Sequence, residues 1–395
     1  MPALNGDGNL YLTFADMGQG DCTMVSLPNG KTLMVDCGTS RWDTKRNAGA
    51  EQSKEEHRNE ILDLRQAVVN MLFEPRFMHA NNRLDALVLT HPDKDHCSEL
   101  QNSLMVKSPA IGAVYFSFND LTKYAQGGAG KWLRVKANVA NYYNITLNLT
   151  ARTINNVAIP EEPATLPAAP NRPTNVRSRS AGTRGFVRIL DGTKAGGKNC
   201  EVFILASNVV PYPGVQDNST DRNRGSIVTL IVFGSKRIML CGDATFNTEK
   251  FLKDTYGANI ANLELLQLPH HSSMTSSSWA DSPDDNINAI DFVGHVKPRR
   301  IIITASIDSG ERLQLPRYEV IKRYMKAPNQ LLAADRAVHA YLAQVTTYVP
   351  KGSGGKRTRD DTESEPYYYK RRLLVDIVST GTLGAVDYAI TDAEA

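Results

Sequence analysis

Short apolar runs alternate with polar turns along much of the chain. Runs of about strand length cover residues 84–90, 227–233, 236–241 and 263–268. Their length and their content of Val, Ile and Leu predict β-strands. Residues 53–73 differ, because Ile61, Leu64, Val68 and Leu72 recur there at helical spacing with charged residues between them. That pattern predicts an amphipathic helix packed on a sheet.

Two more apolar segments, 9–21 and 32–38, predict an N-terminal pair of strands. The turn LPNGK precedes the second segment and contains the Asn29-Gly30 dipeptide, which is typical of hairpins. Asp36 then lies at the end of a predicted strand.

Potential metal ligands follow three of these runs. They are His91, Asp93, Asp95 and His96 after the first run, Asp243 after the third, and His270 and His271 after the fourth. In open α/β sheets, side chains at the C-terminal ends of strands face a crevice. Imidazoles and carboxylates are ordinary ligands of Zn and Mn. A polar turn without a function is the alternative for any one segment, but three such strand ends favour a binding site.

In content and order, these segments resemble the metallo-β-lactamase superfamily, in particular the hydrolase domain of the competence-type DNA-uptake protein ComEC. The matching segments are FADMGQGD (14–21), TLMVDCG (32–38), LTHPDKDH (89–96), RNRGSIVTLIVFGSKRIMLCGD (222–243) and LQLPHHSS (266–273). This branch is marked by an Asp, here Asp93, where most members have a second histidine. The resemblance implies an α+β protein with the four-layer αββα sandwich of the metallo-β-lactamase fold.

The resemblance also implies two divalent metal ions, Mn or Zn. His91 and Asp93 would hold one ion, Asp95 and His96 the other, Asp243 would bridge them, and His271 would complete a coordination sphere. Two such ions can share a hydroxide that attacks a phosphorus centre. The oxygen-rich ligand set tilts the choice from Zn toward Mn.

We assign catalytic roles to His270 and Asp95. His270 would donate a proton to the leaving group or hydrogen-bond to a phosphate oxygen. The reverse assignment, with His270 as the ligand and His271 as the outer group, stays open.

Five further residues are expected to support the site or to bind substrate: Asp36, Asn223, Ser226, Arg222 and Arg224. By resemblance, Asp36 orients a ligand histidine or supports the His91 loop, with turn capping as the alternative. Arg222 and Arg224 can clamp phosphate, and Asn223 and Ser226 match a small polar motif of the ComEC branch. For these four, a purely structural role is the alternative.

Two departures from the family pattern matter. Ser272 stands where the HHGS-like turn has glycine, which questions the local backbone conformation. Leu315 precedes Pro316 where relatives often carry His, so no ligand is assigned there. The GQGD turn at 18–21 is expected to be structural.

Composition favours one catalytic domain spanning 1–395 over two equal domains. The net charge is only +3, which gives no general attraction for polyanions. The five cysteines form no C-x-x-C pair and indicate reduced core residues in a cytoplasmic protein. The N-terminus lacks the features of a signal peptide, and the apolar runs are too short to span a membrane.

Two polar stretches interrupt the pattern. Residues 118–198 predict a long central insertion near the rim of the site, partly flexible, with Arg172, Arg177, Arg179 and Arg184 as candidate phosphate contacts. Residues 351–372 predict a polar loop, in which Tyr367, Tyr368 and Tyr369 beside Lys370, Arg371 and Arg372 could stack bases. A solvated loop without a role is the alternative for both.

The sequence therefore favours a metal-dependent phosphodiesterase, foremost a nuclease with DNA as its substrate. A hydrolase of a small phosphodiester, such as a nucleotide signal or a phosphorylcholine-like ester, would use the same centre. A third hypothesis is a non-catalytic protein partner in a multi-subunit system, for instance a bacterial defence module. A lactamase or thioester hydrolase is least favoured, because Asp93 departs from the H-x-H pattern of those branches.

Overall fold

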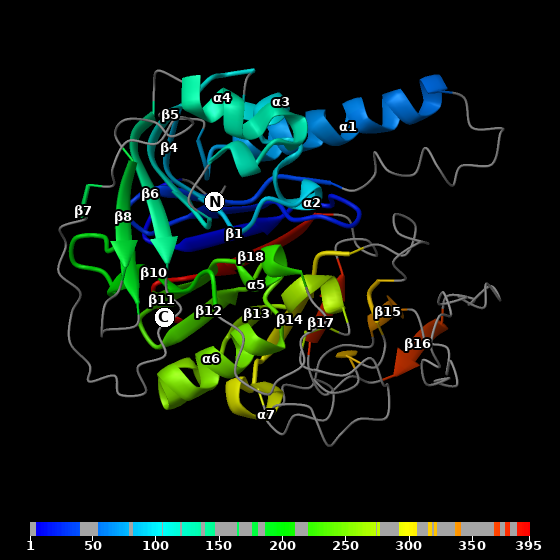
Figure 1. The fold of residues 1–395 in the computed structure, drawn as a ribbon. Coiled ribbons are helices and arrows are strands. Elements are labelled where there is room, and N and C mark those ends of the chain that lie inside the picture. Colours follow the sequence, from blue (N-terminus) through cyan, green and yellow to red (C-terminus); the bar gives the residue numbers. More distant parts are fainter. Residues whose placement is uncertain are drawn as a thin grey trace, which may run out of the picture.

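The structure is a computed structural model. It describes residues 5–39, 54–78, 82–104, 106–118, 121–135, 139–146, 164–165, 176–180, 186–209, 220–273, 275–276, 292–305, 315–317, 320–321, 336–340, 367–371, 376–379 and 385–395. Within these residues, a nine-stranded and a seven-stranded sheet pack against each other (Figure 1). A further two-stranded sheet pairs β15 (Arg336–Ala340) with β16 (Tyr367–Arg371).

The first sheet begins with a C-terminal strand and then follows the chain. Its order is β18 (Val386–Ile390), β1 (Leu10–Phe14), β2 (Thr23–Ser26), β3 (Thr32–Val35), β4 (Arg83–Leu89), β5 (Ala110–Phe116), β6 (Val139–Thr146), β8 (Val176–Ser180) and β7 (Ala164–Thr165). The LPNGK turn joins β2 to β3, so the predicted N-terminal pair is a meander of three strands. From β3 to β8 the neighbours run parallel. The C-terminal ends of these strands therefore share one edge of the sheet.

The second sheet has the order β17 (Asp376–Ser379), β14 (Arg300–Ile303), β13 (Leu265–Gln267), β12 (Lys236–Leu240), β11 (Val228–Phe233), β10 (Cys200–Ala206) and β9 (Val187–Asp191). Strands β12, β13, β14 and β17 are parallel. The predicted runs 227–233, 236–241 and 263–268 thus become β11, β12 and β13, three adjacent strands of this sheet.

Helices cover the outer faces of both sheets (Figure 1). Helices α1 (Lys54–Leu72), α3 (Leu100–Leu104) and α4 (Ala129–Val135) pack on the first sheet, and α6 (Phe246–Tyr256) and α7 (Phe292–Val296) pack on the second. Successive side chains of a strand alternate between the core that lies between the two sheets and the core that lies under the helices, because these strands are buried on both faces. In β4, Leu87 and Leu89 face the helices while Val88 faces the other sheet. The predicted α+β four-layer sandwich is confirmed.

The helix predicted over 53–73 is confirmed as α1, with Ile61, Leu64, Val68 and Leu72 buried. Within the stretch 118–198, the described parts contribute strands to both sheets. Strands β6 and β8 widen the first sheet, and β9 ends the second. In β6, Tyr142 is buried on the face toward the helices and Ile145 on the face toward the other sheet.

Some of the expected contact residues cannot be placed. Arg172, Arg184 and Arg372 lie outside the described residues, while Arg177 and Arg179 belong to β8. In the predicted polar loop 351–372, residues 367–371 form β16. Among the described helices, none is both long and apolar enough to cross a membrane.

Candidate metal centre

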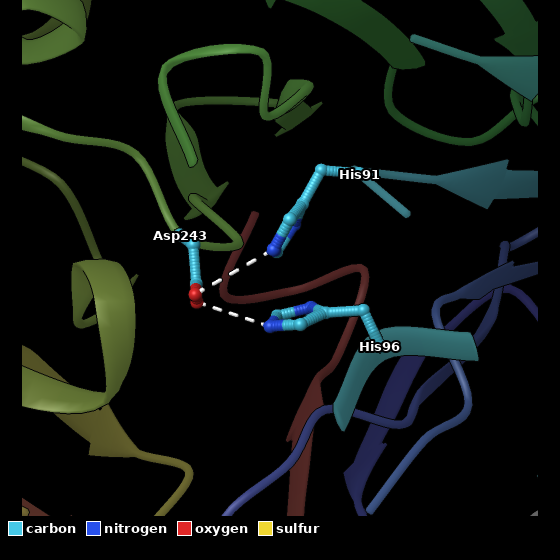
Figure 2. Close-up of side chains that lie close together, drawn as sticks. All are labelled: His91, His96 and Asp243. Atoms are coloured by element: carbon cyan, nitrogen blue, oxygen red, sulfur yellow. Dashed lines mark ion pairs between the residues drawn. The ribbon is translucent and has the colours of Figure 1, made fainter. Parts of the chain in front are cut away.

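Three of the predicted ligands, His91, His96 and Asp243, point toward one another from segments that follow strands of both sheets (Figure 2). His91 follows β4, and the short helix α2 (Lys94–Cys97) carries Asp95 and His96. Asp243 follows β12 in the other sheet. Asp93 is the N-cap residue of α2, but its carboxylate makes no capping hydrogen bond and faces the centre instead.

Asp243 joins two groups of side chains through its two oxygens. Its Oδ2 lies 3.6 Å from His91 Nε2, and that nitrogen lies 3.7 Å from Asp93 Oδ2. Its Oδ1 lies 3.0 Å from His96 Nε2 and 3.4 Å from His271 Nε2. Asp95 Oδ2 is 3.6 Å from the same His271 nitrogen. The structure therefore brings together all six residues expected to bind metal.

Four buried polar atoms at this point lack a hydrogen bond: the Nε2 atoms of His91, His96 and His271, and Asp243 Oδ1. Leaving one buried polar atom unsatisfied costs about 1–3 kcal/mol. Four atoms that converge without partners fit a bound cation, which would satisfy them together. Three overlapping sets among the described residues have the spacing of metal ligands. They are His91, His96 and Asp243; Asp95, His96 and His271; and Asp21, Asp36 and His96.

The Nδ1 atom of each of these three histidines lies within hydrogen-bond distance of a protein oxygen. Ser226 Oγ lies 3.2 Å from His91 Nδ1, Asp36 Oδ2 lies 2.8 Å from His96 Nδ1, and the Thr304 carbonyl lies 2.8 Å from His271 Nδ1. A carbonyl can only accept, so His271 carries its proton on Nδ1 and its Nε2 is available as a ligand.

Asp36 connects α2 to the loop after β4. Its backbone has φ 55°, a left-handed conformation that Asp adopts more readily than most residues. Its Oδ1 accepts from the Thr90 amide at 2.8 Å, and its Oδ2 accepts from Thr90 Oγ1 at 2.5 Å as well as from His96. The carboxylate thus contacts both the residue before His91 and the ring of His96.

Glycines allow the loops to approach this closely. A Cβ on Gly38 would lie 2.5 Å from the backbone of Asp95, His96 and Cys97. Gly242 has φ 50°, and a Cβ there would lie 2.9 Å from the Thr90 side chain. The loop that contains Gly38 therefore packs closely against α2, and the loop that contains Gly242 packs closely against the residue before His91.

The turn after β13 holds three successive left-handed residues, His270 (φ 50°), His271 (φ 51°) and Ser272 (φ 66°). Ser272 thus adopts the conformation that glycine would reach without strain. It is buried, and Arg317 fixes it through a backbone hydrogen bond of 3.1 Å. This turn directs His270 and His271 to different partners.

His270 stands outside the group of unpartnered atoms. Its Nε2 accepts from Asn223 Nδ2 at 2.9 Å, and its Nδ1 lies 2.6 Å from Thr275 Oγ1. Its Nε2 is also 3.3 Å from Asp243 Oδ2. Burial lowers the pKa of His270, against the raising influence of Asp243. The contacts favour His271 as the ligand and a neutral His270 beside it.

Charges within the centre are strongly coupled. Burial opposes ionisation of Asp95, but the nearby His271 ring and the charge of His96 outweigh it and lower its pKa to about 2. Burial also opposes protonation of His271, yet Asp243 and Asp95 raise its pKa to about 9. In the same way Asp243 and Asp36 raise the pKa of His96 well above its usual value. The carboxylates therefore hold protons on two histidines, and a bound cation would replace them.

Helix α5 (Asp221–Arg224) forms the neighbouring wall. Thr220 caps it, and Asn223 Nδ2 also lies 3.4 Å from Asp243 Oδ2. Arg222 Nη1 donates to Asp93 Oδ1 at 2.9 Å. Arg224 pairs instead with Asp221 on its own helix.

The GQGD turn contributes more than the sequence suggested. Gln19 Nε2 lies 3.4 Å from Asp95 Oδ2, and the buried Asp21 carboxylate lies 3.7 Å from His96 Nδ1 and 3.8 Å from His271 Nδ1. Burial raises the pKa of Asp21. In the sequence, only their position beside glycines in a turn at a strand end pointed to Gln19 and Asp21. Nothing in the sequence pointed to Thr304, which contacts His271 through its main-chain carbonyl.

No family model matches the sequence, and no curated protein does. Similar solved structures include human tRNase Z, short form, with 13% identity over 74% of this chain and 91% of that chain, at a TM-score of 0.36. The metallo-β-lactamase fold protein YhfI from Bacillus subtilis has 14% identity over 75% of this chain and 86% of that chain, at 0.33. CmlA, a diiron β-hydroxylase from Streptomyces venezuelae, has 16% identity over 78% of this chain, at 0.36, and this chain spans 46% of its length. The fold and the site described above rest on the chain's own geometry.

Proposed function

We propose that this protein is a metal-dependent phosphodiesterase that cleaves DNA. The observation that carries the proposal is the convergence of four buried, unpartnered ligand atoms from His91, His96, His271 and Asp243. Carboxylates of Asp93 and Asp95 flank them. This set suits two hard or borderline divalent ions, Mn or Zn.

Bound there, two divalent ions would lower the pKa of a water molecule and stabilise the charge that develops on a phosphoryl group. Asp243 would keep the two positions together, because one of its oxygens faces each group of side chains. No protein nucleophile is then needed, which agrees with a centre built from imidazoles and carboxylates.

His270 is placed to handle a proton. Its Nε2 accepts from the Asn223 amide, and its Nδ1 donates to Thr275 Oγ1. Because burial lowers its pKa, the ring would take the proton that the attacking water gives up and pass it to the leaving oxygen.

A polymeric substrate is supported by strand β8. It contains Arg177 and Arg179 and runs parallel to β6, so its C-terminal end lies at the same edge as that of β4. Three strand spacings separate β4 from β8, or roughly 14 Å. Along the axis of duplex DNA, about four base pairs have that length. A small phosphodiester would not reach so far.

Metal analysis and cleavage assays test this proposal. We expect up to two divalent ions per chain and Mn- or Zn-dependent cleavage of labelled DNA and of bis-p-nitrophenyl phosphate. Asp243→Ala should lose metal and reduce cleavage to background while circular dichroism stays unchanged. Cleavage of the small ester without any polymer would select the small-molecule alternative. An inactive protein that retains metal would select the non-catalytic partner role.

A further inference from the structure

Arg222 occupies the exposed side of the metal centre. Its side chain is 58% exposed, and its partner Asp93 is 28% exposed. The two oxygens of Asp93 divide their contacts, since Oδ2 faces His91 and Oδ1 accepts from Arg222. The guanidinium therefore lies directly beside a residue expected to bind metal.

The two arginines of α5 differ in their surroundings. Arg224 is only 12% exposed and pairs with Asp221 three residues before it. Arg222 points across to α2 and reaches Asp93, 129 positions away in sequence. Arg222 thus contacts a residue expected to bind metal.

The ion pair between Arg222 and Asp93 is easily shared with a ligand. Exposed pairs of this kind contribute little to stability, so a substrate can take over donors at little cost. A guanidinium has five N–H donors in a planar fork, and the structure records one of them on Asp93. The remaining donors can bind two oxygens of a phosphate side by side.

The charge of the centre makes such a cation necessary. The carboxylates of Asp21, Asp36, Asp93, Asp95 and Asp243 lie at this centre, and two divalent ions would bring four positive charges against them. A centre without net positive charge holds an anionic diester weakly. Arg222 adds the positive charge at the side that solvent reaches.

We propose that Arg222 is the substrate-binding residue that selects anionic phosphoesters, holding a non-bridging phosphate oxygen while Asp93 keeps its other oxygen toward His91. This inference rests on the proposed function for its substrate class. It predicts that Arg222 acts on substrate binding and not on the metal.

The variants Arg222→Gln and Arg222→Lys test it, measured by kcat and KM for bis-p-nitrophenyl phosphate, by calorimetric binding of p-nitrophenyl phosphate, and by metal content. We expect Arg222→Gln to lower kcat/KM roughly 10- to 100-fold and to weaken p-nitrophenyl phosphate binding by a similar factor, with metal content unchanged. Arg222→Lys should recover part of both losses, because it keeps the charge without the fork.

Arg83→Gln is a matched control. Arg83 is 54% exposed and pairs with Asp85 at 2.7 Å, but it lies at the start of β4, the end opposite His91. It should behave as the wild type. A fall in the metal content of Arg222→Gln, or kcat/KM within threefold of the wild type, would overturn the inference.

The same data separate this inference from the proposed function. Diester cleavage that does not depend on Arg222 would refute the inference and leave the function standing. Binding of p-nitrophenyl phosphate that depends on Arg222, without cleavage of any diester, would do the reverse.

Discussion

The substitution Asp36→Asn changes one buried oxygen to an amide nitrogen behind His96. In the wild type, Asp36 Oδ2 accepts from His96 Nδ1 at 2.8 Å, so the Nε2 lone pair can face the metal position. In Asp36→Asn, Oδ1 can still accept from the Thr90 amide, which leaves Nδ2 toward His96. An amide nitrogen only donates, so His96 must accept at Nδ1 and carry its proton on Nε2. That proton blocks the ligand position.

The magnitude follows from the contacts that are lost. A hydrogen bond to a charged group contributes about 1.5–3 kcal/mol, and replacing the partner of a ligand histidine typically weakens metal binding about 10- to 100-fold. We expect a loss in that range for the ion held by His96 and His271. The backbone is not a complication, because Asn tolerates the left-handed conformation of position 36 as well as Asp does.

Metal titration by calorimetry and nitrogen chemical shifts of the histidine rings are the measurements. Asp85→Asn is the control, since Asp85 also accepts from a backbone amide, that of Thr32 at 2.9 Å, and from Arg83, but lies at the far end of β4. It should bind metal as the wild type does. Wild-type affinity and stoichiometry in Asp36→Asn would refute the tautomer argument.

Two further outcomes are expected. Because His271 has a pKa of about 9 and the pKa of His96 is also raised, both rings are positively charged at pH 7 in the metal-free protein. Metal binding should therefore release up to two protons, one from each ring, and metal affinity should increase as pH rises toward 9. Calorimetry in buffers of different ionisation enthalpy measures the proton release, and a release of zero would contradict this prediction. Gly242→Ala adds a Cβ 2.9 Å from the Thr90 side chain, whereas Gly257, with a similar φ of 48°, has open space around it. Gly242→Ala should therefore lower the free energy of unfolding by about 1–3 kcal/mol more than Gly257→Ala does. Denaturant unfolding measures both variants, and equal midpoints would show that the protein relieves the contact.

Local patterns predicted the strands and the strand ends that carry the proposed ligands, because each of those features depends on a few adjacent residues. The sandwich was expected from the resemblance of these segments to a known superfamily. The runs before His91, Asp243 and His271 became β4, β12 and β13. Pairings between distant segments were not predictable in this way. Strand β18 pairs with β1 across nearly the whole chain, and no short pattern encodes that partnership.

The supporting contacts of the centre were only partly predictable. Asp36 was identified as a candidate because it ends a strand beside the ligands. Thr304 contributes a main-chain oxygen, which any residue could supply, so its identity carries no information. The different partners of His270 and His271 follow from a turn with positive φ angles, and two adjacent identical residues cannot reveal which one turns inward.

The proposed ligands come from both layers of strands, His91 and His96 from one and Asp243 and His271 from the other. Bound ions would thus act as reversible cross-links between the two sheets. The five cysteines of the chain form no disulfides that could do the same. Chelators should then lower the melting temperature as well as the turnover, by an amount that grows with the logarithm of metal concentration over its dissociation constant. Heat resistance of this protein would depend on the metal supply of its surroundings.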